Sequence, residues 1–550
     1  MRHVRQIALV LLTACGGHRM ASPSIYQSAA MAPPPAAQIA ADPDGTAEAH
    51  HDWGKNPWVD ASRDRLSTFA ADVDTSSYTQ ARRALTEGAL PVPAGVRTEE
   101  FVNYFRYAFP APAAGGPFAV VMDAAPSPLA PGRHILRVGV GTRAKSTAER
   151  KPAHLVFLVD VSGSMGTADK LGLAQHALQV MTENLGPRDS VALVTYAGST
   201  RVVLPATGME RRADILAAID DLTAGGSTAM ASGIDLAYAE AMKGLLPGAI
   251  ARVIVLSDGD ANVGPAGHEA HLRIIAERAK AGVTLSTIGF GTGNYKDHAM
   301  EQLANRGNGN SFYIDTAAAA TKVFSEQLGA TLEVVAKDAK LQVEFDPAVV
   351  TRYRLLGYEN RDIADAQFRD DQVDAGEIGA GHQVTAMYEV ELTAGARLAP
   401  APLGLVRIRH KSPEIGAADT AVEATFAMTT PPAPSFAAAS ADLRFAFAVA
   451  AFADVLRGAE DAQWWSLDEI AAIARDAAGD DRDRAELLTL IGRARGLRGT
   501  TATTTPRPGA CAPPPAAGPR GSRCLADDLD GPGDGEGAHG APATDAPPRG

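Results

Sequence analysis

The chain has 550 residues, 46% of them hydrophobic, which is enough for several folded domains with cores of their own. Its formal net charge of −13 argues against nucleic acid as a partner, because phosphate binding needs a basic surface. The 53 glycines and 36 prolines crowd both ends of the chain, which indicates flexible termini around a folded middle.

The first twenty residues read "MRHVRQIALVLLTACGGHRM". Two arginines precede the apolar segment 7–14, which is too short to span a bilayer and is typical of a secretion signal. The ending "LTAC" resembles a bacterial lipobox, which implies that residues 1–15 are a lipoprotein signal peptide and that Cys15 carries the lipid. Gly16 stands where an Asp would otherwise redirect sorting, so the resemblance implies the outer membrane in a two-membrane bacterium. An ordinary cleaved signal peptide that happens to contain a cysteine is the alternative.

Residues 16–56 are rich in Ala and Pro without periodicity, and they are predicted to form a flexible tether with a mean reach of about 35 Å. Together with the lipobox, this predicts a lipid-anchored, extracytoplasmic protein of the bacterial cell envelope. The last segment, residues 498–550, is predicted to be a disordered tail. It contains Cys511 and Cys524, which either form a disulfide in that compartment or remain two free thiols.

Residues 57–150 are predicted to form a first flanking domain. "TSSYTQARRALTEGALP" reads as a helix that is capped at Thr75 or Ser76 and stops at Gly88. "TEEFVNYFRYAF" reads as a second, aromatic helix, and "PFAVVMDAAPSP" and "RHILRVGVGTR" read as strands.

Residues 151–332 alternate strands with helices. "HLVFLVD", "ARVIVLSDGD" and "VTLSTIGFG" are apolar strands, and "SVALVTYAG" and "TRVVLPA" are two strands joined by a tight turn at Gly198 and Ser199. Continuous apolar strands that alternate with helices predict an α/β fold with a mostly parallel sheet covered on both faces.

Residues 333–435 contain short alternating strands such as "KLQVEFDP" and "HQVTAMYEVEL", which predict a β-rich flanking domain resembling a sandwich. Residues 436–497 are predicted to be helical, with a capping box at Ser466 and Glu469. The apolar run 445–453 is too short for a membrane span and is predicted to be a packed amphipathic helix.

Predicted strands lie on both sides of the α/β segment, near residues 117–141 and 336–428. We expect these two sets to join in one β unit, with the α/β domain inserted between them. A structure that placed them in separate domains would contradict this expectation.

Oxygen-bearing side chains follow two of the predicted α/β strands. "VFLVDVSGSM" ends in Asp160, Ser162 and Ser164, "VIVLSDGD" contains Asp258, and the Gly-rich loop "TAGGSTAM" contains Thr228. Ligands of open α/β sheets bind beyond the carboxyl ends of the strands, so these side chains are expected to meet. Two carboxylates and three hydroxyls form an all-oxygen set, which suits Mg²⁺, Mn²⁺ or Ca²⁺ and not zinc.

The motifs "DVSGSM", "GGST" and "LSDG" resemble the metal-ion-dependent adhesion site of von Willebrand factor type A (VWA) domains, with all five family positions matched in order. The resemblance implies a Rossmann-like, doubly wound domain whose bound divalent cation, Mg²⁺ in the first place, is completed by an acidic side chain of a partner protein. The segments "RTEEFVNYF" and "YRLLGYENR" resemble the N-terminal and C-terminal flanks of a group of bacterial VWA lipoproteins. The resemblance thus covers roughly residues 57–497.

Three further motifs imitate other sites. "DVDTSSY", with Asp72 and Asp74, imitates an Asp-x-Asp nucleophile but fits a helix-capping turn better. "DGDANVGPAGHE" imitates a calcium loop, yet Val263 stands where the loop requires glycine. "HEAH" is one residue short of a zinc-protease motif. No catalytic residue is predicted, and the protein is expected not to be an enzyme.

The functional hypothesis is a non-enzymatic protein that is held to the membrane through Cys15 and binds a protein ligand through the metal site. The alternative is an envelope scaffold, for assembly or stress, in which the metal only stabilises the fold. A degenerate motif that keeps its hydroxyls merely as helix caps is the remaining possibility.

Overall fold

The structure is a computed structural model, which describes residues 53–71, 74–112, 116–146, 148–227, 230–259, 264–291, 297–327, 332–373, 375–413 and 420–499. The chain divides into a segment, Met1–Gln38, and a unit, Ile39–Gly550, that holds every described residue. The predicted signal peptide with Cys15, nearly all of the tether, and Cys511 and Cys524 in the tail lie outside the described residues.

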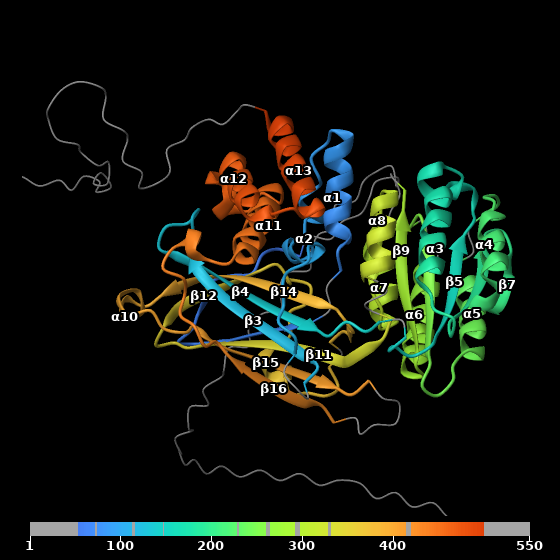
Figure 1. Cartoon of the computed structure of the whole chain (residues 1–550), viewed down its shortest axis with the longest axis horizontal. Helices are drawn as coiled ribbons and strands as arrows, with labels where there is room; N and C mark the ends of the chain where they lie inside the picture. The colour runs from blue at the N-terminus through green and yellow to red at the C-terminus, as the bar shows by residue number, and fades with distance from the viewer. Residues whose placement is uncertain are drawn as a thin grey trace, which may run out of the picture. The chain divides into compact units, whose positions relative to one another are not determined.

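An α/β domain occupies the middle of the chain (Figure 1). Its strands are β5 (Ala153–Asp160), β6 (Ser190–Tyr196), β7 (Thr200–Gly208), β8 (Ile250–Ser257), β9 (Val283–Phe290) and β10 (Ser311–Ile314). Its helices are α3 (Leu173–Asn184), α4 (Arg212–Asp220), α5 (Met230–Lys243), α6 (Gly264–Lys280), α7 (Asp297–Arg306) and α8 (Ala317–Lys322). The strand order is β10-β9-β8-β5-β6-β7. All neighbours pair in parallel except β6 and β7, which form the predicted hairpin.

Both faces of this sheet are covered by helices. Phe157 of β5 packs into a core with α3, α4 and α8, whereas the next residue, Leu158, packs into a second core with α5, α6 and α7. Both side chains are completely buried. Since successive strand residues point to opposite faces, a strand covered on both faces must be apolar throughout. The prediction of a mostly parallel, doubly covered α/β fold is confirmed.

Two antiparallel sheets form a β-sandwich. The first has the order β1-β12-β14-β4-β3 and the second the order β13-β11-β15-β16, with β2 also paired to β11. The first sheet consists of β1 (Val59–Asp60), β3 (Phe118–Pro126), β4 (Arg133–Thr142), β12 (Val350–Leu356) and β14 (Gln383–Leu392). The second consists of β2 (Leu66–Ala70), β11 (Val334–Phe345), β13 (Ile378–Gly379), β15 (Gly404–Lys411) and β16 (Val422–Ala427), and the short helix α10 (Ala394–Leu398) follows β14.

Strands from before and after the α/β domain share this sandwich. β4 pairs with β14 over nine residues, from Arg133↔Glu391 to Gly141↔Gln383. Side chains from both sheets, among them Val138 of β4 and Val343 of β11, fill one core. The expectation of a single β unit interrupted by the α/β domain is confirmed. The segments 57–150 and 333–435, which the sequence analysis also named as separate flanking domains, therefore share one β unit.

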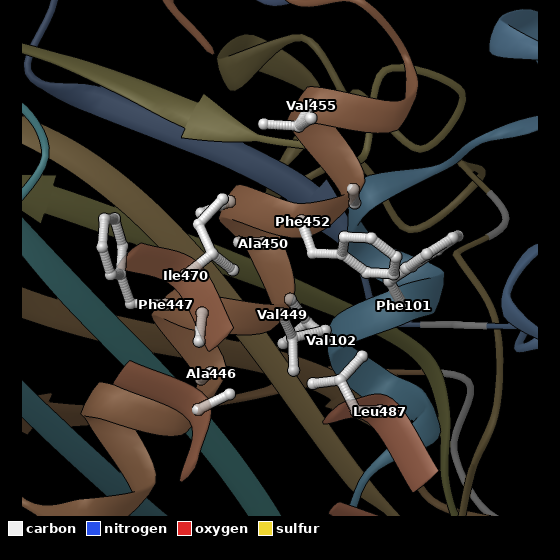
Figure 2. Close-up of a cluster of buried hydrophobic side chains, with 14 of the residues drawn as sticks. Phe101, Val102, Ala446, Phe447, Val449, Ala450, Phe452, Val455, Ile470 and Leu487 are labelled. Atoms are coloured by element: carbon white, nitrogen blue, oxygen red, sulfur yellow. The ribbon is translucent and has the colours of Figure 1, made fainter. Parts of the chain in front are cut away.

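A group of helices packs on the outer face of the first sheet. It comprises α1 (Ser76–Glu87), α2 (Thr98–Tyr104), α11 (Ala441–Leu456), α12 (Leu467–Ala478) and α13 (Arg482–Arg498). Figure 2 shows α11 at the centre, with Phe452 beside Phe101 of α2, and with Ile470 of α12 and Leu487 of α13 nearby.

Helix α11 is buried on all sides, so the prediction of an amphipathic helix for the run 445–453 was wrong. The polar face of an amphipathic helix needs solvent, whereas α11 is enclosed by α2, α12 and the sheet. In the part of the chain that the structure describes, no helix has the length and apolar character needed to cross a membrane.

The N-terminus of α1 is capped by a residue of another helix and not by the residues at its own start. Neither Thr75 nor Ser76 provides the cap; the backbone N–H of Ser77 donates to Oε2 of Glu100 on α2, at 2.8 Å. The helix ends at Gly88 in the left-handed conformation, with φ of 85°, as predicted. At the start of α12, the Ser466 hydroxyl accepts from the backbone N–H of Asp468 at 3.2 Å.

Buried ion pairs connect the α/β domain to the β unit. Asp74 accepts hydrogen bonds from the backbone N–H of Ser311 on β10 and from the Arg361 guanidinium, both at 2.8 Å. Arg361 also pairs with Glu301 of α7 at 3.2 Å, and Arg97 reaches the same carboxylate at 3.3 Å. Asp74, part of the Asp-x-Asp motif, is thus a fully buried structural carboxylate.

Two buried acids make stability pH-dependent. Burial, followed by the charges of Glu359 and Glu100, raises the pKa of Glu99 to about 7, and burial raises the pKa of Asp454 to about 6 despite the nearby Arg457. The folded state therefore holds these protons more tightly than the unfolded chain, where the pKa values are near 4. Their contribution to stability is largest below pH 4 and is lost as the pH rises toward 8.

The expected result concerns the slope of stability against pH. Between pH 5 and pH 8, the free energy of unfolding of the wild type should fall as these two groups lose their protons. In the double variant Glu99→Gln, Asp454→Asn this fall should be smaller by on the order of a few kcal/mol. Urea denaturation at both pH values measures this difference. Parallel pH profiles for wild type and variant would contradict it.

Candidate metal centre

The candidate metal site lies where the sheet changes its winding direction. β5 is flanked by β6 on one side and β8 on the other, and the helix that follows β5 (α3) and the helix that leads into β8 (α5) lie on opposite faces. Asp160 is the last residue of β5, and Asp258 comes directly after β8. Such a switch point, at the carboxyl ends of the strands, is the place where open α/β sheets bind ligands.

Backbone hydrogen bonds bring the Gly-rich loop to the same place. The N–H of Gly163 donates to the carbonyl of Gly226 at 3.0 Å, and the N–H of Gly225 donates to the carbonyl of Val161 at 2.7 Å. Gly226 has φ of 93°, and a Cβ there would lie 3.1 Å from the backbone nitrogen of Gly198, so only glycine fits. Thr228, two residues further on, lies outside the described residues, and its hydroxyl has no position in the structure.

Asp160 is completely buried and held by two donors. Its Oδ1 accepts from the backbone N–H of Ser162 at 2.9 Å, and its Oδ2 accepts from the Ser257 hydroxyl at 3.2 Å. Burial first, and the charge of Asp258 in addition, raise the pKa of Asp160 against the opposing hydrogen bonds from Ser162. The hydrogen bonds therefore fix the orientation of the carboxyl group, and a nearby positive charge would stabilise its ionised form.

The two serine hydroxyls lie beside each other. Oγ of Ser162 and Oγ of Ser164 are 3.0 Å apart. Ser162 is buried, whereas Ser164 is exposed on the 3₁₀ turn η2 (Gly163–Met165). The serine pair thus extends from the buried carboxylate to the surface, so a cation held there would remain accessible to a partner.

Sequence reasoning missed two residues of the site, Lys170 and Ser257. Nζ of Lys170, on the π-helical turn η3 (Ala168–Gly172), lies 3.0 Å from Oδ2 of Asp258, and both side chains are largely buried. The Lys170 stem crosses Gly291, where a Cβ would lie 2.4 Å from Cε of the lysine. A lysine near a helix start is normally solvated, so its sequence position carries no signal of this contact.

The donor set fits a hard divalent cation. Asp160 and Asp258 supply two negative charges against the single positive charge of Lys170, and the hydroxyls of Ser162 and Ser164 add neutral oxygens. Across the described ranges, no group of three or more His, Cys, Asp or Glu side chains is arranged so that it could hold a metal ion. A site in this part of the fold would thus depend on serine oxygens and water as well as carboxylates.

The other sequence motifs lie either on a helix or partly outside the described residues. Glu269 and His271 of "HEAH" lie on helix α6. Residues 260–263 of the imitated calcium loop and Asp72 of the Asp-x-Asp motif lie outside the described residues.

Comparison with known proteins identifies the α/β domain and the chain as a whole. The model of the von Willebrand factor type A domain matches residues 154–327, a model named von Willebrand factor matches residues 44–137, and the C-terminal model of uncharacterized protein YfbK matches residues 330–497. The chain is 39% identical over 479 residues to uncharacterized protein YfbK of Escherichia coli strain K12, and 82% of each chain is covered. The chain belongs to the YfbK family.

The chain also has more distant similarities. This YfbK-family chain is 25% identical over 289 residues to the uncharacterized protein sll0103 of Synechocystis, with 51% of the chain and 67% of the relative covered. A solved von Willebrand factor type A protein from Catenulispora acidiphila matches with 18% identity and a TM-score of 0.40, over 70% of this chain and 91% of the other. The match of the family model to residues 154–327 confirms the VWA assignment of the α/β domain. The assignment of lipid anchoring and of the metal stays a prediction.

Replacing Lys170 by methionine should strengthen metal binding. Methionine keeps an unbranched stem over Gly291 but removes the positive charge next to Asp258. The dissociation constant for Mg²⁺ should therefore fall about tenfold. This free energy is only part of the repulsion expected between the lysine and the cation at an effective dielectric constant of about 20. Calorimetric titration of wild type and variant measures this. Weaker binding in the variant would show that Lys170 instead holds Asp258 in position for the cation.

Proposed function

We propose that this YfbK-family protein is a non-enzymatic, lipid-anchored envelope protein that binds a protein partner through a divalent cation at Asp160, Ser162, Ser164, Thr228 and Asp258. Mg²⁺ is the proposed cation, with Mn²⁺ and Ca²⁺ as alternatives, and a partner carboxylate is proposed to complete its shell. Cys15 is the proposed lipid attachment point, in the outer membrane if the bacterium has two membranes.

One observation supports this proposal above the others. Two carboxylates from distant segments, Asp160 and Asp258, lie close enough for the charge of one to raise the pKa of the other. Two like charges at a buried strand end are costly unless a cation balances them. Lys170 balances one of them, and the exposed hydroxyl of Ser164 opens the site toward solvent.

The test is retention of partners by the immobilised chain, lacking residues 1–15, from a detergent extract of the envelope. A specific partner should be retained in Mg²⁺, released by EDTA, and not retained by Asp160→Asn. Asp214→Asn, which changes an exposed acid on α4, is the matched control and should behave like the wild type. Equal retention with and without EDTA would contradict the proposal.

An envelope scaffold is the second candidate, because the Lys170–Asp258 pair already balances part of the charge without a metal. The buried ion pairs at Asp74, Arg361 and Glu301 also fasten the VWA domain to its flanks. In that case, Mg²⁺ would raise the melting temperature while partner retention ignored EDTA.

A further inference from the structure

A second candidate site lies at the edge of the VWA sheet opposite the metal site. It is a cavity of about 580 Å³ between the amino ends of β8 and β9 and the segment that leads into β11. The loop between α5 and β8 forms one wall, and residues 332–337 form another. β8 and β9 run parallel, and Asp258 follows the carboxyl end of β8. The length of the strand therefore separates the cavity from the metal site.

The cavity has a largely apolar wall. The side chains that form it come from the loop after α5, from β8 and from the start of β11: Leu245, Leu246, Pro247, Ile250, Leu332 and Val334. Leu246 is 62% exposed, and Met242, four residues earlier on α5, is 37% exposed. An apolar wall that continues onto exposed side chains favours a ligand with a hydrocarbon part.

Two lysines of the cavity carry charges that no described residue balances. Lys151 precedes β5, Lys337 lies on β11, and both residues are partly exposed. Within the described ranges, neither ammonium group forms a hydrogen bond or an ion pair. Because both residues have access to solvent, a ligand in the cavity can reach them.

The other charges of the cavity already have counterparts. Glu333 pairs with Lys145 at 2.6 Å and accepts a hydrogen bond from a backbone N–H at 3.0 Å. Arg252 is 1% exposed, and burial lowers its pKa to about 10 while the charge of Glu377 acts in the opposite direction. Arg252 and Glu377 thus offset each other, and the two lysines leave the cavity with an excess of positive charge.

We propose that this cavity binds an amphipathic anion, a single hydrocarbon chain that ends in a carboxylate or a phosphate. The anionic group is held by Lys151 and Lys337, because an ammonium group donates hydrogen bonds and accepts none. The hydrocarbon chain lies along the apolar wall and removes it from water. This site shares no residue with the metal site and is independent of the function proposed for it.

The test is calorimetric titration of decanoate and, separately, of decyl phosphate into the chain lacking residues 1–15, below the micelle concentration of each. We expect saturable binding that weakens as salt is added, because the lysines are partly exposed to the solvent. The ratio of the two affinities assigns the site to fatty acids or to phosphate-headed lipids. Decyltrimethylammonium has the same chain with the opposite charge, and acetate lacks the chain, so neither should bind.

Variants separate the charged part of the site from the apolar part. Lys151→Gln combined with Lys337→Gln should weaken decanoate binding about tenfold or more. The melting temperature should not change, because neither lysine pairs with a described residue. Leu246→Asn should weaken binding severalfold. Arg211→Gln combined with Arg495→Gln removes two exposed positive charges on other helices and is the matched control, which should bind like the wild type.

Asp160→Asn separates this site from the metal site, since it should leave decanoate binding unchanged. Absence of saturable binding would overturn the proposal. Equal binding of decyltrimethylammonium, or equal binding by the double lysine variant, would overturn it as well.

Discussion

Replacing Arg361 by methionine is expected to lower the free energy of unfolding by about 3–5 kcal/mol, because it leaves two buried carboxylates without their shared partner. Arg361 lies between Asp74 and Glu301, and the three side chains are exposed by 10%, 0% and 6%. Methionine fills part of the volume but donates no hydrogen bond. Urea denaturation of wild type and variant at pH 7 measures the loss.

An exposed ion pair provides the control for Arg361→Met. Arg143 and Glu149 pair at 3.1 Å with side chains exposed by 62% and 49%, so Arg143→Met should change stability by less than about 1 kcal/mol. Adding Asp74→Asn to Arg361→Met should recover part of the loss, since one buried charge that the guanidinium no longer balances disappears. A loss for Arg361→Met no larger than for Arg143→Met would show that the junction does not hold the VWA domain to its flanks.

Asp160→Asn is expected to abolish stabilisation by Mg²⁺ while leaving the metal-free protein as stable as the wild type or more so. Asparagine keeps the acceptor for the N–H of Ser162, and its amide can donate to the Ser257 hydroxyl, which is both donor and acceptor. It also removes a buried charge that lies near Asp258. A cation would lose a carboxylate ligand, so the affinity for Mg²⁺ should drop at least about 100-fold. Losses of up to about 100-fold are seen for residues that only orient a metal ligand, and the loss of a ligand itself should be no smaller.

Thermal melts with and without Mg²⁺ measure both effects of Asp160→Asn. At a concentration 100 times the wild-type dissociation constant, the metal should stabilise the wild type by about 2.7 kcal/mol and the variant by no more than about 0.4 kcal/mol. Asp214→Asn should retain the full response. If the metal-free variant melted well below the wild type, Asp160 would serve the fold and not a cation.

The α/β domain could be predicted because its local signals agree. Val156 to Val159 are apolar at every position, and a parallel strand covered on both faces permits nothing else. The prediction of an amphipathic helix for α11 was wrong because an apolar run of nine residues does not show whether one face or all faces of the helix will be covered. The cap of α1 was missed for a similar reason, since Glu100 comes from another helix and is distant in sequence.

The candidate site was predictable only in its strand-end part. Asp160, Ser162 and Ser164 follow one strand closely, and Asp258 follows another, so the sheet brings them together by its topology. Lys170 reaches Asp258 through a turn and a long side chain, a contact that depends on tertiary packing over Gly291.

The most direct test of the metal site is calorimetric titration of Mg²⁺ and Mn²⁺ into the chain lacking residues 1–15, beside Asp160→Asn and Asp214→Asn. Binding of one cation per chain by the wild type and by Asp214→Asn, but not by Asp160→Asn, is the predicted result. Titrations without binding heat in the wild type, or with equal affinity in Asp160→Asn, would contradict a cation site at the end of β5.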